Sequence, residues 1–177
     1  MKQDRKQQKE RKPRGKTPMD AALGYLGFRA RTVREVERYL DEKQYGEYEI
    51  MQVVDRLLEL GLLNDAQFAS EFVSSRLRTK PMSRRHLREQ LRAHELPRDI
   101  IDDAIAEITD AQELESAVAC AEKYSEQYAN LEAREHSQRV TRRMLSRGFD
   151  YLTVRMAMER LSLAATEEEA LDLEDEE

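Results

Sequence analysis

Arginines at helical spacing are the residues of this chain best suited to chemistry. Between residues 76 and 98, eight basic residues stand against two glutamates, in a chain whose formal net charge is −6. Arg84, Arg88 and Arg92 lie four residues apart and would share one face of a helix. Because a guanidinium pairs equally well with a carboxylate or a phosphate, this stripe predicts contact with nucleic acid or with an acidic protein surface. A solvated helix face with internal ion pairs is the alternative for any single arginine.

Basic residues recur at corresponding places in the first and last thirds of the chain. The last third has Arg139, Arg142, Arg143 and Arg147, whereas nearby glutamates dilute the arginines of the first third. The recurrence favours a binding role for the set. The candidate residues for contact with a partner or with DNA are Arg84, Arg85, Arg88, Arg92, Arg142, Arg143, Arg147, Arg29 and Arg31.

Patterns typical of catalysis are missing from the sequence. Gly24 and Gly27 lack the Lys-Ser/Thr pair that a phosphate-binding loop requires. The three histidines are scattered and have no cysteine or second histidine at metal-binding spacing. Cys120 is the only cysteine, which excludes an intrachain disulfide and fits a reducing compartment. We therefore predict a protein that is not an enzyme and that needs no metal or cofactor.

The elements that must position the arginines follow from an apolar pattern that recurs three times. Three apolar residues at spacing i, i+4, i+9 precede a second apolar stripe each time, which indicates helix, tight turn and helix. The three sets are Val36, Leu40 and Tyr45; Leu87, Leu91 and Leu96; and Val140, Met144 and Phe149. No stretch shows the sustained alternation of a strand. The predicted fold class is therefore all-α, with three tandem helical units.

Local signals predict where several helices begin and end. Thr32 and Glu35 form a capping box, in which each side chain bonds the backbone amide of the other residue. A first helix is expected over about 19–28, and the longest connection of the core over about 124–135. Further predicted helix starts are at Asn64-Asp65, Ser83, Pro97, Thr109-Asp110 and Asp150.

Charge is concentrated at the two ends of the chain. Residues 1–16 carry eight Lys or Arg residues against two acids, and residues 166–177 carry eight acids and no base. Such segments bury too little apolar surface to offset the entropy of ordering, so both should be disordered. The predicted organisation is a basic arm over 1–17, helical repeats over 18–65, 66–110 and 111–165, and an acidic tail over 166–177.

Bulk properties limit where the protein acts. No apolar run approaches the roughly 20 residues that a membrane-spanning helix needs, and the charged beginning of the chain lacks the apolar stretch of a secretion signal. We expect a cytoplasmic protein, monomeric and without a membrane partner.

Four blocks of sequence resemble the RecX family, whose members regulate the RecA recombinase. In order, the blocks cover residues 22–40, 60–69, 83–91 and 142–150, and the resemblance extends over roughly 19–162. They read ALxYLxxRxRTxxEVxxYL, LGLLNDxxFA, SRRxLxxxL and RRMLSRGFD. One departure is the turn of the second unit, where His94-Glu95-Leu96 replaces the glycine that family members usually carry. That turn should therefore either place a non-glycine residue in a strained conformation or adopt an altered geometry.

The resemblance implies an elongated, modular protein of three tandem three-helix-bundle repeats. It further implies a partner, the RecA filament, in whose groove the protein would restrain filament growth, ATP hydrolysis and strand exchange during homologous recombination and DNA repair. The arginines would contact the acidic groove surface or filament-bound DNA, and single- or double-stranded DNA is a further candidate partner. The alternative is a direct DNA-binding protein whose units act like helix-turn-helix modules. The acidic sum of residues 17–165 argues against that alternative.

Overall fold

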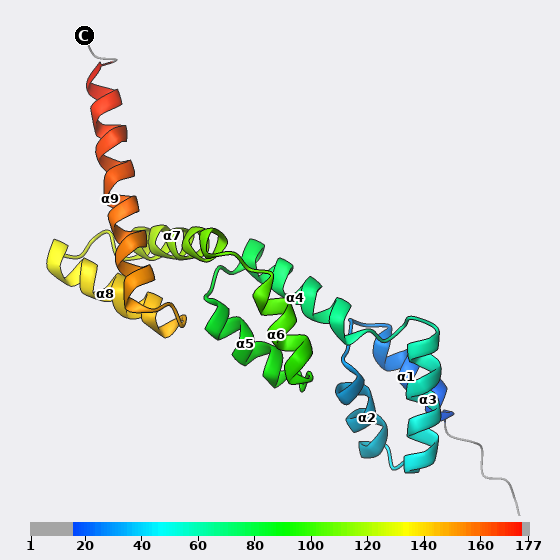
Figure 1. Ribbon diagram of the computed structural model, residues 1–177. Helices are drawn as coiled ribbons and strands as arrows, with labels where there is room; N and C mark the ends of the chain where they lie inside the picture. Colours follow the sequence, from blue (N-terminus) through cyan, green and yellow to red (C-terminus); the bar gives the residue numbers. More distant parts are fainter. Residues whose placement is uncertain (1–15, 175–177) are drawn as a thin grey trace, which may run out of the picture. The chain divides into compact units, whose positions relative to one another are not determined.

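Helices make up the regular structure of the chain. The structure is a computed structural model that describes residues 16–174, with side chains described as far as Ser162. Over these residues it contains no strand, which confirms the all-α helical-repeat fold (Figure 1). The helices are α1 (Pro18–Leu26), α2 (Val33–Glu42), α3 (Glu47–Glu59), α4 (Asp65–Thr79), α5 (Arg84–Ala93), α6 (Arg98–Ala106), α7 (Asp110–Gln127), α8 (Ala133–Ser146) and α9 (Tyr151–Glu174).

The helices form two compact units, divided between Leu63 and Asn64. Unit 1 contains α1–α3 around one cluster of buried apolar side chains. Unit 2 contains two such clusters, one among α4–α6 and the other among α7–α9. Each set of three helices thus packs around a core of its own, and the sets α4–α6 and α7–α9 belong to the same compact unit.

The recurrent apolar pattern supplies the centre of each core. In unit 1, Val36 and Leu40 are fully buried, whereas Tyr45 is half-buried and donates its phenolic hydrogen to the Lys16 carbonyl oxygen at 2.6 Å. Thr32 caps α2 with the predicted capping box. Its hydroxyl accepts a hydrogen bond from the Glu35 amide, and the Glu35 carboxylate accepts one from the Thr32 amide. The cap and the buried stripe together fix α2 against α1 and α3.

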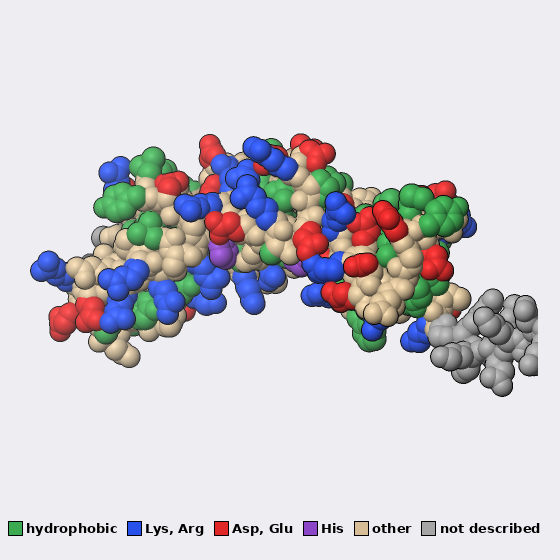
Figure 2. Space-filling view, turned by 90° about the horizontal axis from the view of Figure 1, so that it is seen from below, with side chains coloured by type: hydrophobic (Ala, Val, Ile, Leu, Met, Phe, Trp, Pro, Cys, Tyr) green, Lys and Arg blue, Asp and Glu red, His purple; other side chains and the backbone are tan. Residues whose placement is uncertain are grey.

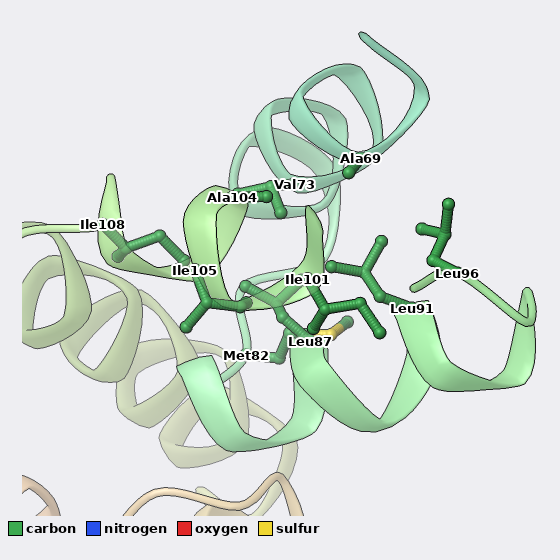
Figure 3. Close-up of a cluster of buried hydrophobic side chains, with 10 residues drawn as sticks. All are labelled: Ala69, Val73, Met82, Leu87, Leu91, Leu96, Ile101, Ala104, Ile105 and Ile108. Carbon is green, nitrogen blue, oxygen red and sulfur yellow. The ribbon is translucent and has the colours of Figure 1, made fainter. Parts of the chain in front are cut away.

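In unit 2, the same pattern holds α5 and α8 in their bundles. Leu87, Leu91 and Leu96 are buried against α4 and α6, where Val73 and Ile101 contribute to the cluster (Figure 3). Val140, Met144 and Phe149 occupy the corresponding positions between α7 and α9. Burial of these stripes leaves the opposite faces of α5 and α8, which carry the arginines, directed away from the cores.

The three turns that follow the middle helices share one backbone conformation. Gln44, Glu95 and Gly148 each have a positive φ, of 62°, 59° and 83°, immediately before the third apolar residue of the pattern. In the turn that lacks glycine, Glu95 therefore takes a left-handed conformation, which is the strained one of the two geometries expected there. Such a conformation is unfavourable for a residue with a Cβ, so the buried Leu96 beside it must hold the turn in place.

A close contact joins the two bundles of unit 2. The hydroxyl of the buried Ser83 donates to the Arg147 carbonyl oxygen at 3.0 Å and accepts from the His86 amide. A Cβ placed on Gly148 would lie 2.5 Å from the Ser83 Oγ atom. Glycine is therefore required at 148 both by its φ and by the start of α5, which packs against the turn between α8 and α9.

Some predicted boundaries were wrong. α7 continues to Gln127, so the connection to α8 covers only 128–132 instead of about 124–135. Pro97 stands at the N-cap of α6 and not at its first helical position. α9 remains helical to Glu174, although disorder was predicted from residue 166; the segment is rich in Glu, Ala and Leu, which favour helix, and has no Gly or Pro. Residues 1–15 of the predicted basic arm and 175–177 of the acidic tail lie outside the described residues.

Candidate partner-binding surface

Arg84, the first arginine of α5, is engaged within unit 2. Its Nη2 atom donates to the Ile108 carbonyl oxygen at 2.6 Å and to an oxygen of Asp110 at 2.7 Å. Its Nε atom lies 3.1 Å from an oxygen of Glu113, whose other oxygen accepts from the Arg84 backbone amide. The Arg84 side chain is only 28% exposed. The residue therefore joins α5 to the start of α7, and its charge is balanced by two carboxylates.

Arg88 is also paired within its own bundle. Its Nε atom lies 3.3 Å from an oxygen of Asp102 on α6, and Arg98 approaches the other oxygen of that carboxylate at 3.4 Å. The predicted stripe of Arg84, Arg88 and Arg92 is therefore not a free basic face. Local spacing could not predict these pairs, because the acids that pair with the stripe are 14 to 29 residues away in the sequence.

Arg85 and Arg92 are the exposed arginines of α5. They are seven residues apart, which places them on the same face of the helix. Arg85 has a loose partner in Glu89, at 3.5 Å, and among the described residues no ion pair or hydrogen bond holds Arg92. This face of α5 can still offer positive charge to a partner, but Glu89 lies between the two arginines and reduces it.

Two arginines at the end of α8 are held by tyrosines instead of acids. The Nε atom of Arg143 donates to the phenolic oxygen of Tyr128 at 3.0 Å, and that of Arg147 donates to Tyr124 at the same distance. The two rings stack with their centroids 6.4 Å apart. The bond from Tyr128 raises the pKa of Arg143 above its already high usual value, so this guanidinium remains charged at physiological pH.

Arg142 and Arg139 complete the basic face of α8. Arg142 is exposed, and none of the described residues pairs with it, whereas Arg139 contacts Glu135 at 3.1 Å. Tyr128, the three arginines Arg139, Arg142 and Arg143, and Ser146 line an open pocket of about 290 Å³. A phosphate or carboxylate in this pocket would meet several guanidinium groups at once.

The two candidates of unit 1 differ from each other. Arg29 is exposed, without a partner among the described residues. Arg31 is half-buried, and its guanidinium lies 3.9 Å from the centroid of the Tyr25 ring, which itself stacks on Tyr39 at 4.1 Å. Arg31 therefore helps to hold α1 against α2 through a cation–π contact. Arg29 is the candidate of this unit that can reach a partner.

The sequence analysis missed the two tyrosines that accept hydrogen bonds from the arginines at the end of α8. Tyr124 and Tyr128 were assigned to a connection, yet they lie at the end of α7, where Tyr124 is buried and Tyr128 is half-buried. A signal was present, because Ala117, Ala121, Tyr124 and Tyr128 continue one helical stripe at spacings of four, three and four. The pairing of tyrosine with arginine, in contrast, depends on the angle at which α7 and α8 pack.

Basic and acidic side chains are distributed unevenly along unit 2. Figure 2 shows one face of the molecule, on which blue Lys and Arg side chains cover much of unit 2 with red acids interspersed.

Of the described residues, no three His, Cys, Asp or Glu side chains are grouped so that they could hold a metal ion. Within the same part of the chain, no helix is long and apolar enough to cross a membrane.

The fold and this surface define a class, that of helical-repeat proteins with arginine-bearing middle helices. Family models assign it further: the model for the first three-helix domain of RecX matches residues 19–57, and that for the second matches 64–105. A crystal structure of RecX from Lactobacillus salivarius is similar to this chain with a TM-score of 0.72 and 27% identity, over 82% of this chain and 95% of that one.

Curated relatives agree with the family models. The regulatory protein RecX of Prosthecochloris aestuarii is 32% identical over 145 residues, which are 81% of this chain and 92% of the relative. The regulatory protein RecX of Enterococcus faecalis is 29% identical over 161 residues, which are 89% of this chain but only 60% of that longer relative. The chain belongs to the RecX family of regulatory proteins.

Proposed function

We propose that this protein regulates RecA filaments as an inhibitor that lies along the filament groove and restrains filament growth, ATP hydrolysis and strand exchange. Membership of the RecX family supports a regulatory role, and its relatives are named as regulatory proteins. Homologous recombination and DNA repair in the cytoplasm are the processes in which such a regulator would act.

The observation that carries the proposal is the recurrence of exposed arginines on successive helical units. Arg29 in unit 1, and Arg92 and Arg142 in unit 2, are each exposed and unpaired among the described residues. A filament is a periodic polyanionic partner, so several modest contacts on one chain gain strength through effective concentration. A repeat protein supplies such contacts without a deep pocket.

The proposal is tested by RecA-catalysed ATP hydrolysis on single-stranded DNA, titrated with the full-length protein. We expect hydrolysis to fall with increasing protein. The Arg142→Glu variant should inhibit less, whereas Arg160→Glu, the same charge change at another exposed arginine of unit 2, should inhibit as the wild type does. Unchanged hydrolysis at saturating wild-type protein would contradict the proposal.

The second candidate function is direct binding of DNA by helix-turn-helix-like units. The observation that favours it is the basic face of α8, which a phosphate backbone would fit. A direct DNA binder retains naked duplex DNA in the absence of RecA, with a steep dependence on salt. A filament regulator requires RecA for tight association.

A further inference from the structure

Two tyrosines at the end of α7, Tyr124 and the C-cap residue Tyr128, hold two arginines at the end of α8 in a repeated arrangement. Tyr124 accepts from Arg147, and Tyr128 accepts from Arg143, each at 3.0 Å and each through the Nε atom of the arginine. The two tyrosines are four residues apart in the sequence, and so are the two arginines, so the arrangement repeats after about one helical turn. Because Nε is the bonded atom, the terminal Nη groups of both guanidiniums remain for another ligand.

The chemistry of the acceptor determines what such a bond does to the arginine. A carboxylate that fixes a guanidinium also neutralises it, as Asp110 and Glu113 do for Arg84. A phenol is uncharged at neutral pH, so it fixes the side chain and leaves the positive charge uncompensated. The cost in side-chain entropy of ordering a long arginine is then met in the free protein, before any partner arrives.

We propose that Tyr124 and Tyr128 are positioning residues, which hold Arg147 and Arg143 ready to contact successive phosphates of a nucleic-acid strand. Arg142, exposed beside them, supplies a third contact. The inference rests on the proposed function for its biological setting, in which the strand is the DNA of the filament. Its chemistry requires only a phosphodiester backbone.

Three observations favour a nucleic-acid strand over an acidic protein surface. First, the two held arginines are one helical turn apart, about 6 Å along the axis, which suits a ligand with regularly repeated charge. Second, the ring of Tyr128 lines the same pocket as Arg142 and Arg143, which combines an aromatic surface with basic groups as in single-strand binding sites. Third, α8 has a single acid, Glu135, which is already paired with Arg139.

The test uses the full-length protein with Tyr124→Phe and Tyr128→Phe combined. This variant keeps both rings and removes both phenolic oxygens. The control variant is Tyr25→Phe with Tyr39→Phe, which alters a stacked pair of unit 1. Affinity for a fluorescein-labelled oligothymidylate is measured over a range of salt concentrations without RecA, together with the melting temperature and the NMR signals of the arginine Nε–H groups.

We expect the α7 variant to bind the oligonucleotide about three- to tenfold more weakly, because two arginine side chains must then be ordered when the strand binds. Its affinity should also depend less steeply on salt, since fewer phosphates are neutralised at once. Faster exchange of two Nε–H signals would report the loss of positioning, which a purely structural role for the rings would not produce. The control should bind as the wild type does.

Other results would overturn the inference. Unchanged oligonucleotide binding after loss of the two protected signals would show that the tyrosines do not act through the arginines on phosphates. Weakened inhibition of RecA ATPase with unchanged oligonucleotide binding would show that this face contacts an acidic protein surface instead. If wild-type protein fails to inhibit RecA while the α7 variant still loses oligonucleotide affinity, the proposed function fails and the inference holds.

Discussion

The middle helices of the two bundles in unit 2 contain the same ionisable residues and use them differently. Both α5 and α8 have four arginines, one glutamate and one histidine. On α5, Arg84 is paired with Asp110 and Glu113 of α7, and Arg88 is paired with Asp102 of α6. On α8, Arg143 is paired with a phenol, as is Arg147 just beyond its end.

The difference shows that the number of arginines on a helix does not give the charge it offers to a partner. What decides that charge is the ionisation of the groups that hold the side chains. Carboxylates turn the α5 arginines into links between helices, whereas phenols leave the α8 arginines charged and ordered. We therefore propose that α8 carries the main anion-binding face of unit 2.

The largest effect is expected at the contact that joins the two bundles. Gly148→Ala should lower the free energy of unfolding by about 2–4 kcal/mol, because alanine is strained at a φ of 83° and its Cβ would lie 2.5 Å from the Ser83 Oγ atom. Urea denaturation followed by circular dichroism measures the change. A loss below about 0.5 kcal/mol would show that the α5 start and the turn after α8 are not tightly packed.

A double-mutant cycle separates the two causes of this loss. In a Ser83→Ala background the clash with Oγ is absent, so Gly148→Ala should cost less than it does beside serine, and only the backbone strain should remain. Equal costs in both backgrounds would mean that the contact between Ser83 and residue 148 contributes nothing.

The next prediction compares Arg84, which is paired with carboxylates, with the exposed Arg142 of α8. Arg84→Ala should destabilise the protein by about 1–3 kcal/mol, because it breaks the link to Ile108 and Asp110 and leaves Glu113, which is 18% exposed, without its cation. Arg142→Ala, at an exposed site without a partner among the described residues, should change stability by less than about 0.5 kcal/mol. Similar losses in urea denaturation would remove the distinction between the two helices.

Local features of α5 and α8 could be predicted from the sequence. The apolar pattern located α5 and α8 correctly, because Leu87, Leu91, Val140 and Met144 reveal the buried face by spacing alone. The caps Thr32, Asn64, Ser83 and Thr109 were also confirmed, since a cap is a local interaction within four residues. Local order is therefore accessible from the sequence of this chain.

Partners from distant segments were not accessible in this way. The pairing of Arg84 with Asp110, and that of Arg147 with Tyr124, join residues more than 20 positions apart and depend on how the helices pack. A sequence pattern gives the face on which an arginine lies, but not the group that it meets there. For this reason the candidate residues were identified as a set, while their division into paired and available arginines required the structure.

The smallest effect concerns the single thiol, which lies in the same bundle as the α8 arginines. Burial raises the pKa of Cys120 from 9.0 to about 11, although the charges of Arg147 and Lys123 oppose the shift. Since the thiolate is the nucleophile, the folded protein should react with iodoacetamide at pH 8 far more slowly than the urea-unfolded protein. Mass spectrometry measures the rate of alkylation. If the folded and the unfolded protein were alkylated equally fast, the α7–α9 core would open readily.

The central claim is that α8 carries more of the available charge of unit 2 than α5 does, and a pair of matched charge reversals tests it most directly. One variant combines Arg142→Glu with Arg143→Glu, and the other combines Arg85→Glu with Arg92→Glu, so that the net charge changes equally. Inhibition of RecA ATPase on single-stranded DNA is measured for each. We predict that the α8 variant needs at least about tenfold more protein for half-maximal inhibition, the equivalent of about 1.4 kcal/mol, and that the α5 variant, in which Glu89 already reduces the charge, needs only about two- to fourfold more. An equal loss in both variants, or a larger loss in the α5 variant, would contradict it.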